Sequence, residues 1–422
     1  MNASRPLLTL EEALARVAAG AAPHAIAATE TVSTFDALGR VLASEVVSTV
    51  DVPPLDNTSM DGFALRVADV PAAGTVLRVA QRIAAGQVGA VLKPGTAARI
   101  FTGAPVPEGA DAVVMQEQCE AIPGGASDPA ENGLGQVRVM TVPSAGQWVR
   151  RCGEDVKQGA VVLPRGLRMT PQAMGLAATA GAAQLTVVRR PRVAVFSTGD
   201  ELAMPGEPLR PGAIYNSNRF TLRGLLGAAG CDVHDLGIVP DRLDATRTAL
   251  REAALQCDLI VTSGGVSVGE EDHLRAAVAA EGAIENWQVS MKPGKPVAFG
   301  QVRRPDGTSA LFLGLPGNPV SSFVTFLLVG VPLLRVLQGR PVQTRPSLPL
   351  RAAFDWPRAD KRREFLRVRV NAEGALERFD NMSSGVLSST VWADGLADIA
   401  PGRVVVAGDV VPYLPLSSLL QD

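Results

Sequence analysis

The stretch Asp258–Asp272, DLIVTSGGVSVGEED, decides the fold class of this chain. An apolar run at 259–261 stops at a pair of glycines, Gly264 and Gly265. This pattern is typical of a buried strand that leads through a glycine turn into a helix, where backbone N–H groups bind phosphate. The carboxylates at 270–272 would repel a phosphate unless a cation lay between them, so we expect Mg²⁺ here.

Strands and helices alternate on both sides of this stretch. We expect continuous apolar strands at 193–196, 233–239, 259–261 and 311–313, and helices at 218–229, 243–256, 271–280 and about 320–338. Asn218 is the expected N-terminal cap of the first of these helices. The pattern predicts a doubly wound, mainly parallel sheet with both faces covered. Because ligands bind such sheets at the carboxyl ends of the strands, the polar loops that follow the strands are the candidate site.

The remaining chain predicts a multidomain α/β protein. Thr9 and Glu12 form a capping-box pattern at the start of a helix over 9–19. Short strands between glycines and prolines are expected at 75–83, 97–101, 112–116 and 136–141. We also expect a loop over 52–64, a short helix at 174–180, and strands at 365–370, 404–406 and 410–414. We predict an N-terminal mixed domain (1–50 and 147–190), an inserted β-rich domain (51–146), the α/β domain (191–340) and a small C-terminal β-barrel-like domain (341–422).

Composition excludes several classes of protein. A net charge of −2 over 422 residues argues against general binding of nucleic acid or of anionic membranes. The four cysteines form no CxxC pair and suggest reduced thiols in a cytoplasmic protein. No secretion signal is visible, and the apolar run 323–336, which contains Pro332 and Arg335, predicts a buried helix rather than a membrane span.

Polar loops follow the strand ends of the α/β domain at 197–201, 263–272, 292–296 and 315–322. Lys292 and Lys295 flank a stiff Pro-Gly turn, and two ammonium groups about 6 Å apart repel by roughly 3 kcal/mol. Such a pair either reaches solvent in a simple turn or holds an oxyanion. The neighbouring glycine turns favour the oxyanion, as does Pro319, which predicts a helix start with free N–H groups.

The acidic residues have two interpretations each. Asp272 and Asp241 could bind Mg²⁺ or cap the helices that follow them. Asp200 and Glu201 could equally satisfy backbone groups of their own turn. The three histidines have no partner for a metal site, and no Walker A, GxGxxG, GxSxG or HExxH pattern occurs.

The chain resembles the molybdopterin molybdenumtransferases, a family that includes the E domain of gephyrin. The resemblance covers nearly the whole chain. It rests on DNTSMDGFA at 56–64, RIFTGAPVP at 99–107, GEDV at 153–156, and the polar loops above. The α/β domain alone is less specific, because the related molybdopterin adenylyltransferases share it.

The resemblance implies transfer of molybdenum from molybdate to adenylylated molybdopterin, with Mg²⁺-dependent release of AMP. It implies catalytic roles for Asp61, Thr102, Glu201, Asp241, Asp272, Lys292 and Lys295, of which Glu201, Asp241 and Asp272 would bind Mg²⁺. It assigns substrate binding to Asn216, Ser217, Gly264, Gly265, Ser267, Gly269, Pro296, Pro316, Gly317, Asn318, Pro319, Ser321, Arg362, Ser384 and Ser388.

The chain departs from the family pattern on the molybdate side. Arg362, Arg363 and Arg367 all match the family arginine, and Gly385 stands where some members carry arginine. Thr58-Ser59 replaces the commoner Ser-Ala.

The resemblance also implies a homodimer that contacts the adenylyltransferase of the pathway and molybdoenzyme chaperones. We expect it to bind neither nucleic acid nor membranes. Two alternatives remain open at this point: the adenylyltransferase step itself, and a non-catalytic scaffold of the gephyrin kind.

Overall fold

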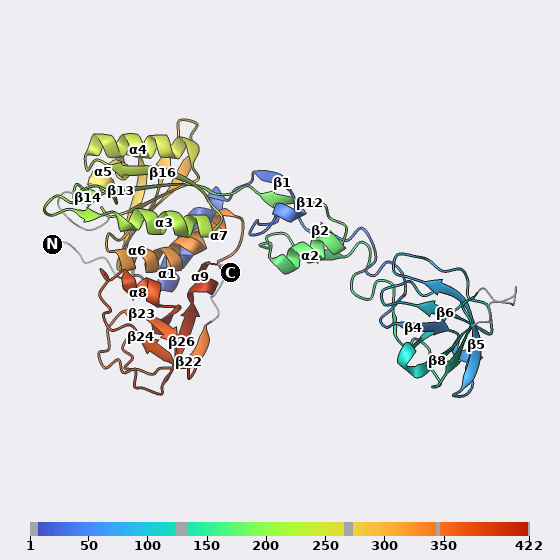
Figure 1. Ribbon diagram of the computed structural model, residues 1–422. Helices are drawn as coiled ribbons and strands as arrows, with labels where there is room; N and C mark the ends of the chain where they lie inside the picture. The colour runs from blue at the N-terminus through green and yellow to red at the C-terminus, as the bar shows by residue number, and fades with distance from the viewer. Residues whose placement is uncertain (1–6, 124–132, 266–272, 343–346, 421–422) are drawn as a thin grey trace. The chain divides into compact units, whose positions relative to one another are not determined.

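The computed structural model describes residues 7–123, 133–265, 273–342 and 347–420 (Figure 1). The chain divides into two compact units, one formed by residues 31–187 and the other by residues 1–30 and 188–422. Each unit is described by itself.

The larger unit is built on a six-stranded sheet. Its order is β16 (Asp232–Val239), β13 (Arg192–Thr198), β17 (Leu259–Ser263), β21 (Ser309–Leu315), β20 (Pro296–Arg303) and β18 (Gly282–Gln288). Neighbours from β16 to β21 are parallel, and β20 runs antiparallel to both of its neighbours. The predicted mainly parallel sheet is therefore confirmed.

Helices cover both faces of this sheet (Figure 1). One face carries α4 (Leu243–Gln256) and α5 (His273–Glu281); the other carries α3 (Ser217–Ala228), α6 (Pro319–Thr325) and, further out, α7 (Val331–Leu337) and α1 (Leu10–Ala21). Alternate residues of β13 serve the two faces: Val193 and Val195 pack in the core of α3 and α6, and Ala194 and Phe196 in that of α4 and α5. This explains why the strand is apolar throughout.

The predicted helix ends are confirmed at one place and wrong at another. The α1 capping box is present: the Glu12 N–H donates to Thr9 Oγ1 at 3.1 Å and the Thr9 N–H to Glu12 Oε2 at 2.8 Å. Helix α3 was expected to be capped by Asn218, but Asn216 Oδ1 accepts the Arg219 N–H at 3.2 Å. The helix begins two residues earlier because it follows directly after the short strand β15 (Ile214–Tyr215).

The apolar stretch after Asn318 is a core helix, as expected. Helices α6 and α7 are joined by a π-helical turn, η5 (Phe326–Gly330), into 19 residues with a mean hydropathy of 2.0. Length and composition alone would allow this stretch to cross a membrane. It is nevertheless 89% buried within the protein, which is the environment of a core helix.

The C-terminal part of this unit is a second six-stranded sheet. It contains β19 (Met291–Lys292), β23 (Arg363–Val370), β25 (Gly395–Ile399), β26 (Val410–Pro415), β22 (Leu348–Arg351) and, paired with β23, β24 (Leu376–Arg378). A bridge from Ala352, just after β22, to Leu376 of β24 joins the far sides of the sheet and makes it barrel-like. Short helices α8 (Ser388–Trp392) and α9 (Leu416–Leu420) complete it.

One predicted strand of this part, at 404–406, is wrong. Only Val405 forms a bridge, to Trp356. Gly402 and Gly408, with φ of 75° and 102°, turn the chain on both sides and leave no length for a strand.

The smaller unit contains a third six-stranded sheet. Its order is β7 (Ala112–Met115), β4 (Gly62–Leu65), β6 (Thr96–Ile100), β5 (Thr75–Ile83), β9 (Gln136–Val139) and β8 (Cys119–Ile122), which includes all four predicted strands. The loop predicted over 52–64 is partly wrong. Gly62 lies in β4 so close to β7 that an added Cβ would meet Val114 O at 2.0 Å, so glycine permits a strand there.

The rest of this unit is a small mixed region with its own core of Leu42, Leu163, Met169 and Val187. Its elements are β1 (Thr29–Ser33), which pairs with β12 (Gln184–Val188), β2 (Val46–Val47), which pairs with β11 (Val161–Leu163), β3 (Asn57–Thr58), which pairs with β10 (Val149–Arg150), and α2 (Pro171–Thr179). The predicted helix at 174–180 begins earlier, at Pro171, because Thr170 caps it.

Candidate functional site

The carboxyl ends of the parallel strands bring the predicted loops of the α/β domain to one rim. Ser197 of β13 is paired in register with Ser263 of β17, and Ser263 with Leu315 of β21. On the other side, Thr198 is paired with Val239 of β16. The chain segments that carry Glu201, Asp241, Gly264 and Gly317 therefore start side by side.

The glycine turn after β17 has the predicted conformation. Gly264 and Gly265 have φ of 90° and 63°, and the Gly264 N–H donates to Leu315 O at 3.1 Å. A Cβ on Gly317 would lie 3.6 Å from Gly264 Cα, so the two loops are in contact. Ser267, Gly269 and Asp272 lie outside the described residues, and their assignments stay predictions.

Two asparagines link the start of α3 to this rim. Asn218 Nδ2 donates to Gly317 O at 2.7 Å, and Ser197 Oγ donates to Asn216 Oδ1 at 3.3 Å. Asn216 Nδ2 and Asn218 Oδ1 are buried and have no partner among the described residues. A buried amide without a partner is costly, so these atoms favour a polar ligand at the rim. Asn218 was predicted as a helix cap but not as a site residue, and the predicted Ser217 is the first residue of α3.

Glu201 and Asp241 follow adjacent strands and make no ion pair within the described part of the chain. The carboxylate of Glu201 folds back over its own turn: a Cβ on Gly199 would lie 2.5 Å from Glu201 Oε2. Asp241 does not cap α4, whose N-terminal cap residue is Arg242 and has no side-chain cap bond. The helix-cap role, which was the alternative to Mg²⁺ binding for Asp241, is therefore wrong.

The donor chemistry of these two acids fits Mg²⁺, which prefers carboxylate oxygens and needs only one or two from the protein. Among the described residues no group of three or more His, Cys, Asp or Glu side chains could hold a metal. Asp272, the third acid that the sequence assigns to the metal, is outside these residues.

The lysine turn packs against α6. A Cβ on Gly294 would lie 2.3 Å from Thr325 Oγ1 and 3.5 Å from Ser321 O. Lys295 is exposed, and its ammonium group makes no hydrogen bond or ion pair within the described parts of the chain. Lys292 instead lies 2.8 Å from Glu364 Oε1 and 3.5 Å from Asp360 Oδ2. Within the described residues, Lys292 is therefore paired with carboxylates, whereas Lys295 is not.

At the start of α6, one backbone N–H group already has a hydrogen-bond partner. The Val320 N–H donates to Ser384 O at 3.0 Å, so at least one of the expected free N–H groups is already satisfied. Ser321 is buried, whereas Gly317 and Asn318 are exposed. The contact places the loop of Ser384 beside the α6 terminus, together with the lysine turn that starts at Lys292 and leads through Pro296 into β20. Pro316 and Pro319 flank the exposed pair.

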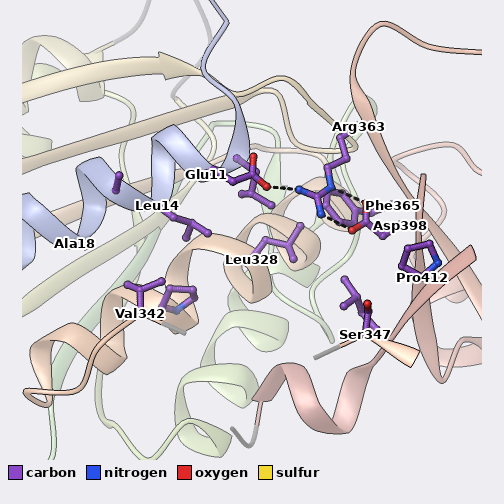
Figure 2. A pocket seen from close by; sticks show the side chains of 14 residues that line it. Glu11, Leu14, Ala18, Leu328, Val342, Ser347, Arg363, Phe365, Asp398 and Pro412 are labelled. Carbon is purple, nitrogen blue, oxygen red and sulfur yellow. Dashed lines mark hydrogen bonds and ion pairs between the residues drawn. The ribbon is translucent and has the colours of Figure 1, made fainter. Parts of the chain in front are cut away.

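Arg363 and Arg367 are occupied elsewhere. Arg363 donates to the two Asp398 oxygens from Nε and Nη2, at 2.6 and 2.5 Å, and to Glu11 Oε1 from Nη1 at 2.5 Å. The hydrogen bond to Asp398 raises the pKa of Arg363. Figure 2 shows this ion pair at the wall of a pocket of about 490 Å³, which α1 lines with Leu14. None of the predicted catalytic residues lines that pocket.

Arg367 is 1% exposed and donates to Ser389 Oγ at 3.1 Å and Ser383 O at 3.2 Å. Burial lowers its pKa to about 10. Its serine partner is Ser389, whereas the predicted Ser388 is exposed at the first position of α8. Among the residues that the structure describes, Arg362 is the one of the three candidate arginines that shares a partner with the lysine turn.

That shared partner is Asp360, which the sequence analysis missed. Arg362 Nε and its terminal nitrogen lie 3.1 and 3.0 Å from the two Asp360 oxygens, and this pairing holds the pKa of Asp360 well below its usual range. Glu364, the other missed acid, also accepts the Trp356 Nε1–H at 2.7 Å. The only sequence signal was the charged run DKRRE at 360–364.

Asp61 and Thr102, in the other unit, are brought together although 41 residues separate them. Asp61 Oδ1 accepts both the Thr102 N–H and the Thr102 hydroxyl, each at 2.7 Å. These hydrogen bonds, first that of the Thr102 backbone, lower the pKa of Asp61, and the Arg99 charge adds to the effect. Arg99 and Arg82 stack on Phe101 next to Thr102, at 4.4 and 4.5 Å from the ring centre.

We expect Thr102→Val to raise the pKa of Asp61, because the variant loses the hydroxyl bond to the ionised form. A lowered native pKa stabilises the fold above the ordinary carboxyl pKa, and this stabilisation is lost as the pH falls through the native value. The variant should lose it at a higher pH. Carboxyl ¹³C NMR titration measures this, with Ser59→Ala as a control, and an unchanged Asp61 titration would contradict the assignment.

Comparisons with known proteins identify three family models along the chain. Residues 8–181 match the family model of the MoeA N-terminal region (domain I and II), 194–336 that of the probable molybdopterin binding domain, and 349–416 that of the MoeA C-terminal region (domain IV).

Two curated relatives and one solved structure match over nearly the full length. The molybdopterin molybdenumtransferase of Haemophilus influenzae is 38% identical over 93% of this chain and 95% of its own. That of Nostoc sp. is 38% identical over 90% and 86%. The structure of the molybdopterin biosynthesis moeA protein from Pyrococcus horikoshii OT3 is 27% identical, covers 97% of this chain and 100% of its own, and has a TM-score of 0.78. The chain therefore belongs to the molybdopterin molybdenumtransferase family.

Proposed function

We propose that this chain transfers molybdenum from molybdate to adenylylated molybdopterin and releases AMP. One observation carries the proposal: two carboxylates with no ion pair among the described residues, a glycine turn and Lys295 belong to loops at the rim of the parallel sheet, and Arg362 of the C-terminal part is linked to the lysine turn through Asp360. A nucleotide phosphate and a second oxyanion both need cations and N–H donors, and both kinds of group occur there.

The chemistry of each side chain indicates which part of the substrate, or which ion, it would bind. Lys295 offers a free ammonium to an oxyanion, and Arg362 offers a planar guanidinium that binds two oxygens at once. Asn216 and Asn218 offer a donor and an acceptor to the polar edge of the substrate. Glu201 and Asp241, with Asp272 from the sequence, would hold Mg²⁺, which when bound neutralises the charge of the phosphoanhydride.

The test of this function is AMP release. The purified chain, given adenylylated molybdopterin and Mg²⁺, is expected to release AMP only after molybdate is added, as measured by chromatography of the nucleotide. Chelation of Mg²⁺ is expected to lower the rate at least about tenfold, because the metal stabilises the departing phosphate. Restoring Mg²⁺ should restore the rate.

A second reaction distinguishes this function from the two alternatives, the adenylyltransferase and the non-catalytic scaffold. With free molybdopterin and ATP instead, the chain is expected to consume no ATP, whereas an adenylyltransferase would. A scaffold would catalyse neither reaction. No AMP release under any of these conditions would overturn the proposal.

We also propose that the chain acts as a homodimer in the cytoplasm and contacts the adenylyltransferase that supplies its substrate and the chaperones that accept its product. Exposed apolar side chains in the smaller unit support self-association, notably Phe35 at 92% and Leu38 at 57% exposure. Sedimentation velocity of the full chain measures this, and a monomer at micromolar concentration would contradict it.

A further inference from the structure

Two cations and two carboxylates form a closed cluster where β19 meets β23. Lys292 is paired in register with Glu364, and its ammonium lies near Glu364 and Asp360. Arg362 binds Asp360 with its side chain and with its backbone N–H, at 3.0 to 3.1 Å. The formal charges of these four groups sum to zero.

The two carboxylates of this cluster are held very differently. The Glu364 side chain is 2% exposed and is fixed by Trp356, so it is part of the domain core. The Asp360 side chain is 22% exposed, follows no strand, and its oxygens are bound only by Arg362 and Lys292 within the described residues. Moving the Asp360 carboxylate away from the two cations would therefore break no hydrogen bond or ion pair to any further residue that the structure describes.

The geometry of Asp360 is that of a bound oxyanion. Its two oxygens occupy the fork of the Arg362 guanidinium, which is the arrangement in which arginine binds carboxylate, phosphate and similar groups. One of these oxygens also faces the Lys292 ammonium at 3.5 Å. A tetrahedral oxyanion that binds Arg362 and Lys292 would need these positions.

We propose that Asp360 is an internal competitor that the oxyanion substrate must displace, and that it thereby sets the affinity and the charge selectivity of this part of the site. The inference rests on the proposed function, because that function supplies the oxyanion. Glu364 stays in place and leaves a net charge of +1 on the cluster once Asp360 has moved away. Displacing Asp360 costs its attraction to the two cations. A dianion is attracted to the remaining positive charge more strongly than a monoanion is and can offset this cost, so Asp360 excludes monoanions.

The experiment compares Asp360→Asn with the wild-type chain. Asparagine keeps the size of the side chain and its acceptor oxygen but competes less well for the guanidinium. Glu377→Gln is the matched control: it also removes one negative charge from a carboxylate that pairs with an arginine in the C-terminal sheet, that of Arg369. Molybdate binding to the full chain is measured by calorimetry, and the molybdate KM and kcat by AMP release.

We expect Asp360→Asn to bind molybdate about tenfold more tightly, with a matching fall in KM and with new inhibition by nitrate, a monoanion. Glu377→Gln should stay within about twofold of the wild type. If Asp360 merely positions Arg362, the variant will bind molybdate more weakly or equally, and the inference is overturned. If the wild-type chain neither binds molybdate nor releases AMP, both the proposed function and the role of Asp360 are overturned. A wild-type chain that does both, with an Asp360→Asn variant that binds molybdate no more tightly, overturns the role of Asp360 alone.

Discussion

Replacing Lys295 by alanine is expected to lower the rate of molybdate-dependent AMP release by about 100- to 1000-fold, the usual effect of removing one donor to a developing or bound oxyanion. The fold should be unaffected, since the Lys295 side chain is exposed and makes no hydrogen bond or ion pair with any other described residue. Its main-chain carbonyl, which accepts the Val289 N–H at 2.8 Å, remains in the variant. Single-turnover AMP release and urea unfolding measure the two effects.

Lys292→Ala is the informative comparison, because the two lysines lie in one turn and differ in their partners. Its loss removes the ion-pair partner that the buried Glu364 has among the described residues. This should cost about 2 kcal/mol of unfolding free energy, less than for a fully buried pair because the Lys292 side chain is 46% exposed. Lys292→Ala should therefore lower both stability and rate, and Lys295→Ala the rate alone. Equal unfolding free energies in the two variants would contradict this division.

The difference between the lysines marks the limit of what could be predicted from sequence. The glycine turn, the rim position of the loops and the α1 capping box all follow from patterns within a few residues, and the structure has them. The partners of Lys292 come from a segment about 70 residues later, which reaches the lysine turn through a two-residue strand pairing. A pairing of only two residues between segments so far apart in the sequence leaves no periodic pattern by which it could be predicted.

The same reason explains the smaller discrepancies. The cap of α3 was assigned two residues too late because Asn216 and Asn218 are equally good caps, and only the end of β15 decides between them. The contact of Asn218 with Gly317, about 100 residues away, could not be foreseen. By contrast, Asp61 and Thr102 were both singled out by their motifs, and the structure joins them.

Gly294→Ala is expected to destabilise the protein by about 2–4 kcal/mol. Two causes add: the residue has a φ of 108°, which L-residues rarely adopt, and the new Cβ would lie 2.3 Å from Thr325 Oγ1, a side chain with no exposure. The nearby Met291 Cε, at 2.9 Å, can move aside, but the helix that carries Thr325 cannot. Urea unfolding measures the loss.

The same substitution should lower the rate of AMP release about 100-fold at a temperature where the variant is still folded, because the turn that carries Lys295 must shift, and a displacement near 1 Å costs that much. Gly307→Ala is the matched control: its φ is 83°, but no atom lies within 4 Å of the new Cβ. It should cost only about 1 kcal/mol and leave the rate unchanged. If both variants lose the same stability and neither loses rate, close packing of the turn against α6 does not hold Lys295 in place.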